Sequence, residues 1–391
     1  MLRGGLWRGG QWRQMFRVKL RPQLKEFYWF QVLFSFAFSL VVIFEPIFFY
    51  KEGFSLQFIA LYYAIHYAVY TFLLPLGGMF VSRFGLERSL TVSLPIFIGY
   101  FVTLSLVDIR SELVWVALAL LTVHKVFYWP AFMAEMARFG DGHNRGTELA
   151  WLGALRYGVG ILGPLMGGVV ASVFGFPILF LVAAGMVMVS SVPLLRTKER
   201  FRTVFMSYTK PWRLMWAVKN RRLLWAMMGL GENLVDMVFW PIFMFIVLGS
   251  ASKLGALVAV GVAVMTVVTF LVGEMADRVS RRTVLRLHVP FLAVSYLFRP
   301  LAAGVTGVVL TDTLGRMAFT GVNLPLSYYI YTRAKRQGVV ATVVSIEMML
   351  SIAKALTALV LVIVFGMTLP FTGLVVAFGL AAVLSLFYFI L

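Results

Sequence analysis

Long apolar runs fill this chain, and shorter stretches between them hold most of the polar side chains. Each run is roughly 18 to 27 residues long, and about 20 residues of α-helix cross the ~30 Å hydrocarbon core of a bilayer. Strands of a membrane barrel would alternate polar and apolar side chains, which these runs do not do. The pattern therefore predicts twelve transmembrane helices, at residues 27–50, 55–81, 89–107, 113–135, 147–173, 177–195, 223–248, 254–272, 283–303, 307–332, 339–365 and 370–391.

Short motifs of the first half recur in the second half at one spacing. Repeats of this kind are typical of membrane transporters, whose halves are related by a pseudo-twofold axis. We therefore predict an all-α polytopic fold, in which the twelve spans form two pseudo-symmetric six-helix bundles around a central cavity. Three matches share an offset of 195 residues, close to half of the 391: 78–85 with 273–280, 46–48 with 241–243, and Pro130 with Pro325.

One long polar stretch, residues 196–222, separates the two sets of six spans. Its alternation of apolar and basic residues, with Phe205, Trp212 and Trp216 among them, favours an amphipathic helix at the membrane surface. The predicted organisation is a basic N-terminal segment at 1–26, a first bundle at 27–195, a linker at 196–222 and a second bundle at 223–391.

The chain carries a net charge of +19, and its basic residues are unevenly placed. Of the 35, 27 lie in the N-terminal segment and in alternate loops with the adjoining span ends, three lie in the opposite loops, and five lie deeper within spans. This asymmetry follows the positive-inside rule and predicts cytoplasmic N- and C-termini in the plasma or inner membrane of a cell. The basic N-terminal segment would lie on the anionic inner leaflet, so the charge does not indicate a nucleic-acid partner.

Motifs for covalent or metal chemistry are missing from the sequence. It has no cysteine, no nucleophile motif, no metal-ligand cluster and no ATP-binding loop. We expect a monomer that is neither an enzyme nor an ATP-driven pump and that uses no cofactor or metal. His66 and His124 lie within spans, where hydrogen-bonded interior side chains are commoner than a metal pair.

The loop after span eight carries the motif Gly-x-x-x-Asp-Arg-x-x-Arg-Arg at 273–282, and a copy at 78–90 has Ser82 where aspartate is usual. With twelve spans in two halves and a basic central loop, the whole chain resembles the major facilitator superfamily, and within it the twelve-span drug/proton antiporters. The resemblance implies a gating role for these loops, and a solvated basic loop without that role is the alternative. The candidate gating residues are Gly78, Arg83, Gly273, Asp277, Arg278 and Arg282.

In this family spans 1, 4, 7 and 10 line the cavity, spans 2, 5, 8 and 11 flank it, and spans 3, 6, 9 and 12 face lipid. A charge inside a span costs ~2.5–3.5 kcal/mol on insertion scales, so it needs a partner, water or a function. One charge breaks the expected distribution: Arg299 in span 9 lies near the end of its span, where it can snorkel to the surface. The charges in the interior of lining and flanking spans are Glu45, Lys125, Arg156, Glu232, Asp236, Asp312, Arg316, Glu347 and Lys354.

Glu232 and Asp236 stand near the middle of span 7, one helical turn apart. Two acids so close in hydrocarbon repel each other, so one of them is expected to hold a proton. A proton-coupled transporter needs a carboxyl of this kind, and Glu232, Asp236 and Glu347 are the candidates. The alternative is a set of fixed ion pairs with Lys354, Arg156 or Lys125.

Basic and aromatic side chains are the candidates for solute contact. Span 4 contains Lys125 in a stretch similar to a family motif that has arginine there and is linked to proton coupling. Asp312 and Arg316 are expected to neutralise each other, whereas for Glu347 and Lys354 pairing and solute contact are equally open. The aromatic candidates could also be ordinary packing. The cavity candidates are Lys125, Arg156, Arg316, Lys354, Tyr63, Tyr67, Trp129 and Trp240.

Span 5 contains the run Gly163-Pro164-Leu165-Met166-Gly167-Gly168, which resembles the glycine-proline motif of drug/proton antiporters. The resemblance implies a gating bend. The alternative is a seam of small residues that lets two helices touch.

Together these features predict a secondary active transporter that moves a small organic solute by alternating access, coupled to protons, with a preference for export of amphipathic compounds. Two alternatives stay open. One is uptake or exchange of an anionic metabolite or lipid-like anion, which the basic residues near the cavity favour. The other is a membrane scaffold that binds without transporting.

Overall fold

The computed structural model describes residues 22–138, 145–196 and 205–391. Within these ranges it describes the backbone alone at 22–25, 137–138, 145–157, 270–278, 331 and 334–337. The basic segment predicted at 1–26 therefore lies almost wholly outside the described residues.

The first half of the chain folds into helices that follow the predicted spans. Span 1 is divided into two helices, and each of the next five spans is one helix. The helices are α2 (Pro22–Val41), α3 (Glu45–Lys51), α4 (Leu56–Phe84), α5 (Leu86–Leu104), α6 (Leu113–Arg138), α7 (Arg145–Val173) and α8 (Phe176–Leu195).

The second half begins after the linker, which contains the short helix α9 (Thr209–Trp216) where an amphipathic helix was predicted. Span 7 is assembled from several short pieces, and each later span is one long helix. The elements are α10 (Arg221–Met228), η2 (Gly229–Gly231), α11 (Glu232–Leu234), η3 (Val235–Phe239), α12 (Trp240–Leu248), α13 (Ala251–Arg278), α14 (Arg281–Phe298), η4 (Arg299–Leu301), α15 (Gly304–Gln337), α16 (Val339–Met367), α17 (Pro370–Ser385) and η5 (Leu386–Ile390).

The described residues contain helices, turns and loops but no strand. Eight of their helical segments are long and apolar enough to cross a membrane. The helices α5, α7, α14 and α15 fall outside that group. The described side chains of α7 form a shorter apolar stretch at Gly158–Val173, and α15 carries Asp312 and Arg316 in its interior. The chain is thus an all-α, multi-pass membrane protein, as the apolar runs predict.

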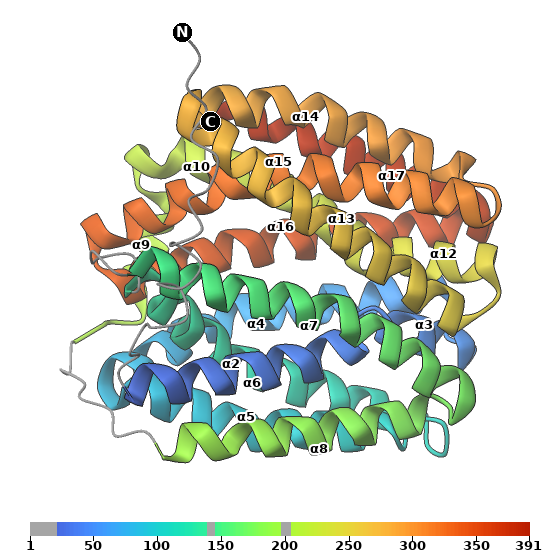
Figure 1. Cartoon of the computed structure of the whole chain (residues 1–391), viewed down its shortest axis with the longest axis horizontal. Helices are drawn as coiled ribbons and strands as arrows, with labels where there is room; N and C mark the ends of the chain where they lie inside the picture. The colour runs from blue at the N-terminus through green and yellow to red at the C-terminus, as the bar shows by residue number, and fades with distance from the viewer. Residues whose placement is uncertain (1–21, 139–144, 197–204) are drawn as a thin grey trace, which may run out of the picture.

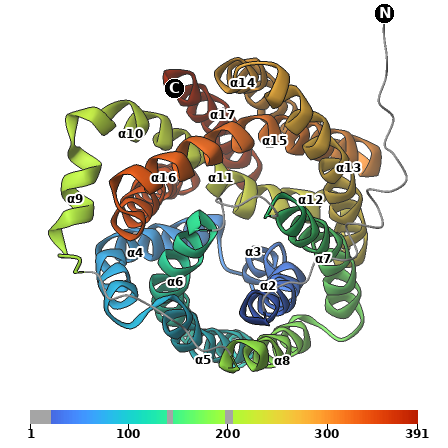
Figure 2. The same cartoon turned by 60° about the vertical axis from the view of Figure 1, so that its left-hand side comes forward.

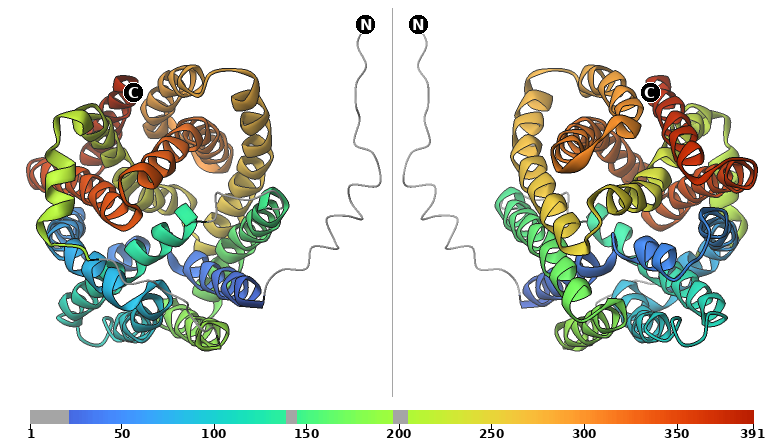
Figure 3. Two further views of the ribbon diagram at one scale, coloured as in Figure 1. Left: turned by 90° about the vertical axis from the view of Figure 1, so that its left-hand side faces the viewer. Right: turned by 90° about the vertical axis from the view of Figure 1, so that its right-hand side faces the viewer.

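The two halves lie side by side, with the first half below the second in Figure 1. The short helix α9 lies at one end of the bundle, and α3 and α12 lie at the opposite end (Figure 1). We call these the linker end and the α3–α12 end. Figure 2 shows α9 on the outside, beside α4 and α16, where it packs against α16. The views from the two ends show the same division into two groups of helices (Figure 3).

Two helix pairs join the halves, α4 with α16 and α7 with α13. Glycines allow the second pair to approach closely: a Cβ atom on Gly168 would lie 2.6 Å from the carbonyl oxygen of Ala251, and one on Gly255 would overlap the carbonyl oxygen of Pro164. Gly163 and Gly167 face α2 just as tightly. The run at 163–168 therefore packs as a small-residue seam on two sides of α7.

Both spans that were predicted as continuous at 27–50 and 223–248 are broken, and at matching places. A turn at 42–44 separates α2 from α3, and the π-helical segment η3 precedes α12. Pro46 and Pro241, which the repeat pairs, are each the second residue of the helix after the break. Proline lacks an N–H group and clashes with the carbonyl four residues earlier, so it disfavours regular α-helix in the turn before each of these two sites.

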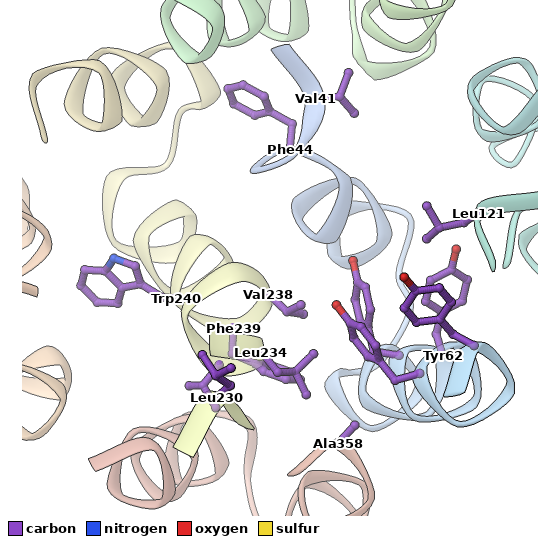
Figure 4. Close-up of a cluster of buried hydrophobic side chains, with 14 of the residues drawn as sticks. Val41, Phe44, Tyr62, Leu121, Leu230, Leu234, Val238, Phe239, Trp240 and Ala358 are labelled. Carbon is purple, nitrogen blue, oxygen red and sulfur yellow. The ribbon is translucent and has the colours of Figure 1, made fainter. Parts of the chain in front are cut away.

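Buried apolar side chains from both halves meet beside these breaks (Figure 4). Phe44 and Tyr62 come from the first half, whereas Val238, Trp240 and Ala358 come from the second. All of them belong to one continuous hydrophobic cluster. The halves are therefore held together by a shared core as well as by the two helix pairs.

Candidate solute and proton site

Glu232 is the most deeply buried acid among the described residues, with no exposed surface. It opens α11, between the 3-10 turn η2 and the π segment η3. Its carboxylate accepts hydrogen bonds from the hydroxyls of Tyr296 on α14 and Tyr388 on η5, the second at 3.0 Å. No ion pair to Glu232 is recorded within the described part of the chain.

Asp236 has a different partner, the guanidinium of Arg299. Arg299 is only 2% exposed, and its guanidinium carbon lies 4.5 and 4.3 Å from the ring centroids of Trp240 and Tyr296. The expectation that Arg299 snorkels to the surface is wrong. The turn η4 directs the side chain into the second half, where an acid and aromatic faces replace water. The partner of Asp236 is therefore none of the three basic residues considered for it.

Asp312 and Arg316 form the ion pair that their spacing on α15 predicts, with 2.7 Å between Arg316 Nε and Asp312 Oδ2. The indole N–H of Trp240 donates to the other carboxylate oxygen of Asp312 at 2.9 Å. Trp240 thus lies inside the second half, apart from the other aromatic candidates. We call Glu232, Asp236, Arg299, Asp312 and Arg316 the second-half network.

A second polar group lies where the halves meet. Lys125 Nζ on α6 is 3.3 Å from His66 Nε2 on α4, and His66 Nδ1 is 2.8 Å from the hydroxyl of Thr122. That hydroxyl donates its proton to the Leu118 carbonyl, so it accepts from Nδ1–H of His66. The Nε2 atom is then the acceptor for the ammonium of Lys125, and His66 is a neutral partner for this cation.

Lys354 approaches the same place from the other half. Its Nζ lies 5.2 Å from the ring centroid of Tyr67, and Lys125 Nζ lies 4.9 Å from that same centroid. Lys354 and Glu347, two turns apart on α16, are buried, yet no hydrogen bond or ion pair of either charged group is recorded within the described ranges. We call Lys125, His66, Tyr67, Glu347 and Lys354 the interface cluster.

The neighbouring tyrosine and acid are already bonded to each other. Tyr63, one turn from Tyr67 on α4, donates its hydroxyl to Glu45 Oε1 at 3.0 Å. Glu45 is the first residue of α3, directly after the break in span 1. Its carboxylate is therefore held toward α4 instead of toward the lysines.

A pocket of about 220 Å³ lies beside Lys125, among α2, α5, α6 and α7. His124 forms part of its wall, bonded to the Ser93 carbonyl at 2.9 Å and stacked 3.9 Å from Phe97. The described residues hold no group of three or more histidines and acids that could bind a metal. The aromatic side chains that line the pocket are Phe34, Phe38, Phe97, Tyr128, Trp129 and Phe132.

The gating candidates are only partly described. A Cβ atom on Gly78 would lie 2.7 Å from Val344 of α16, which is the close helix approach that the motif implies. Arg83 and Arg282 are exposed. The side chains of Arg156, Gly273, Asp277 and Arg278 lie outside the described residues.

Sequence reasoning missed several members of both groups. Arg299 was considered alone, although Tyr296 stands one turn before it on the same helix face. His66 stands between Tyr62 and Tyr70 at i,i+4 spacing, which marks one polar-aromatic face of span 2. No signal in the sequence points to Tyr388, because its position depends on how η5 returns beside α10.

Comparison with known proteins assigns this chain to a family. A model described as Major Facilitator Superfamily matches residues 27–358. No curated protein sequence matches the chain. Among solved structures, a mutant of the nucleoside transporter NupG has a TM-score of 0.70 at 15% identity, with 94% of this chain and 98% of that chain covered. The human organic anion transporter MFSD10 (TETRAN) has a TM-score of 0.65 at 14% identity, covering 96% and 100%. At such identities the likeness concerns the fold.

Proposed function

Because the chain belongs to the major facilitator superfamily, we propose that it is a secondary active transporter that moves a small organic solute by alternating access, coupled to protons. Glu232 is the proton site of this proposal, and the interface cluster with its adjoining pocket binds the solute. The proposed direction is export of an amphipathic solute against proton entry, which the antiporter-like run at 163–168 favours. Both termini would be cytoplasmic, in a plasma or inner membrane.

One observation carries the proton site: a fully buried carboxyl group whose recorded partners, among the described residues, are two tyrosine hydroxyls. Both hydroxyls can donate to the carboxylate, and either can accept a hydrogen bond from the protonated acid. Asp236, four residues on, is neutralised by Arg299. Glu232 can therefore gain or lose a proton while its neighbours keep their partners.

The local backbone supplies a way to pass this change along span 7. Glu232 lies directly before the π segment η3. π-Helical segments are rare in proteins, and those that occur often lie at functional sites. Beyond η3 lies α12, which contacts α3 of the other half. A change in the hydrogen bonds of Glu232 can thus alter the helix pitch of η3, next to the contact that α12 makes with the other half.

The test is transport into proteoliposomes that contain purified protein and a pH indicator in the lumen. A panel of organic anions, cations and neutral solutes is applied with and without an imposed pH gradient. We expect one class of solute to move protons in wild type, and Glu232→Gln to abolish gradient-driven movement while it retains solute exchange. The matched control is Glu112→Gln, at an exposed position.

Gradient-driven transport that survives in Glu232→Gln would remove Glu232 as the proton site. Binding without flux for every solute in the panel would favour the scaffold over the transporter.

A further inference from the structure

We propose that the solute is a small amphipathic organic anion. Its carboxylate or phosphate group binds between Lys125 and Lys354, and its flat apolar body occupies the pocket beside Lys125. This inference rests on the proposed transport function and names the chemical class of the solute.

The two ammonium groups converge from different halves of the molecule. Lys125 belongs to α6 and Lys354 to α16, and both nitrogens lie over the ring of Tyr67. Because both distances, 4.9 and 5.2 Å, end at one centroid, the nitrogens cannot be farther apart than their sum. Ammonium groups this close repel each other, and an oxyanion between them would remove that repulsion.

The described residues leave donors of both lysines unused. Each ammonium has three N–H donors, and the recorded acceptor is His66 Nε2 for Lys125 and, among described residues, none for Lys354. Lys354 as a residue is only 6% exposed, so bulk water does not surround it. A carboxylate or phosphate group supplies several acceptor oxygens at one place and suits these donors.

The nearby acids favour charged lysines without occupying them. Glu347 and Glu45 attract Lys125 electrostatically, but neither forms a recorded ion pair with it. Glu45 is bonded to Tyr63 instead. Glu347 is therefore the distant counter-ion of the solute-free cluster, and an entering anion competes with it.

The pocket indicates the size and chemical character of the apolar body of the solute. Lys125 lines the pocket and no acid does among the described residues, so a cationic head would meet a like charge there. Its walls are mostly aromatic, which suits a ring that packs against them. At about 220 Å³ it is smaller than the ~300 Å³ at which drug-sized sites begin. The body of the solute is therefore one or two rings.

Binding to purified protein in detergent tests the anion directly. The probes are benzoate, 1-naphthoate and phenyl phosphate, with benzamide and benzylamine as neutral and cationic counterparts of benzoate. We expect at least one anion to raise the melting temperature, and benzamide and benzylamine to leave it unchanged. The phenyl phosphate result distinguishes a phosphate site from a carboxylate site. Equal stabilisation by benzamide or benzylamine, or none by any of the three anions, overturns the proposal.

Lysine variants locate the binding site. Lys125→Gln and Lys354→Gln should each weaken binding of the stabilising anion by about 10- to 100-fold, as expected for loss of a charged hydrogen bond. The conservative variants Lys125→Arg and Lys354→Arg should retain most of the affinity. The matched control is Lys253→Gln, an exposed position on α13 that should bind like wild type. Unchanged affinity in both interface variants contradicts the assignment.

Glu347→Gln should change the affinity for the anion in the opposite direction, because it removes the acid that competes with the anion for the lysines. It should tighten anion binding by about threefold or more, the size of a weak charge interaction without a direct ion pair. Weaker anion binding in this variant would contradict the assignment of Glu347 as the competitor of the anion.

Failure of this inference and failure of the proposed function give different results. Anion binding that is lost in the lysine variants, without proton-driven flux in proteoliposomes, retains the site and removes the transporter. Proton-driven flux of benzamide retains the transporter and removes the anion site.

Discussion

The two polar groups differ in how their charges are satisfied. In the second-half network, Asp236 is paired with Arg299, Asp312 with Arg316, and Glu232 is bonded by two tyrosines. In the interface cluster, Lys354 and Glu347 are comparably buried but have no recorded ion pair within the described residues. The network draws its members from one half, whereas the cluster is shared between the halves.

This difference agrees with the proposed alternating access. A network inside one half can keep its contacts while the halves move, so fixed pairs offset the cost of burying its charges. A cluster between halves would lose fixed pairs whenever the halves separate. Charges without a protein partner at this place are available to a ligand. They can be solvated by water when no solute is bound.

The largest effect is expected for the buried pair of the network. Arg299→Leu should lower the free energy of unfolding by about 3 kcal/mol. This is the lower end of the usual ~3–5 kcal/mol range for breaking a buried pair, because the Asp236 side chain is 37% exposed and can take up water. The measurement is denaturation in mixed detergent micelles, with Arg110→Leu at an exposed loop position as control. The double variant with Asp236→Leu should recover part of the loss, and a loss below that of the control would contradict a structural pair.

An intermediate effect is expected for one hydrogen bond of the same network. Trp240→Phe removes the donor to Asp312 and keeps an aromatic ring, while Arg316 still neutralises the acid. The loss in unfolding free energy should be about 1–2 kcal/mol, the usual cost of leaving one side of a hydrogen bond to a charged group unmade. A variant as stable as wild type would mean that water replaces the indole.

The smallest effect on stability is expected for the interface cluster. Lys354→Gln breaks no hydrogen bond or ion pair recorded among the described residues, and it loses the approach of the ammonium group to the Tyr67 ring. It also removes the cost of burying an ammonium group. Its unfolding free energy should therefore stay within about 0.5 kcal/mol of wild type or rise. A loss comparable to that of Arg299→Leu would show that Lys354 is paired after all, and the contrast between the two groups would disappear.

The sequence predicts most of the fold because the fold depends on signals that are local. Apolar runs long enough to span a bilayer mark the helices, and the 195-residue offset marks the two halves. The spacing of Asp312 and Arg316 also predicts their pair, since neighbours at i,i+4 on a helix meet without help from other elements.

The site could be predicted only in part, because its partners come from distant segments. Glu232 and Lys125 stand out as charges within apolar runs. Their partners Tyr296, Tyr388 and His66 are ordinary residues of other helices, and only packing brings them close. Arg299 was misplaced because a general assignment of span 9 to lipid says nothing of a turn such as η4, which directs one side chain inward.

The matched breaks before Pro46 and Pro241 bear on the ancestry of the chain. If the two halves descend from one duplicated gene, as the 195-residue offset indicates, the proline after each break would already have been present in the half-length ancestor. That ancestor would have needed a second copy of itself to enclose any solute. The two short helices beyond the breaks, α3 and α12, contact each other across the boundary between the two halves.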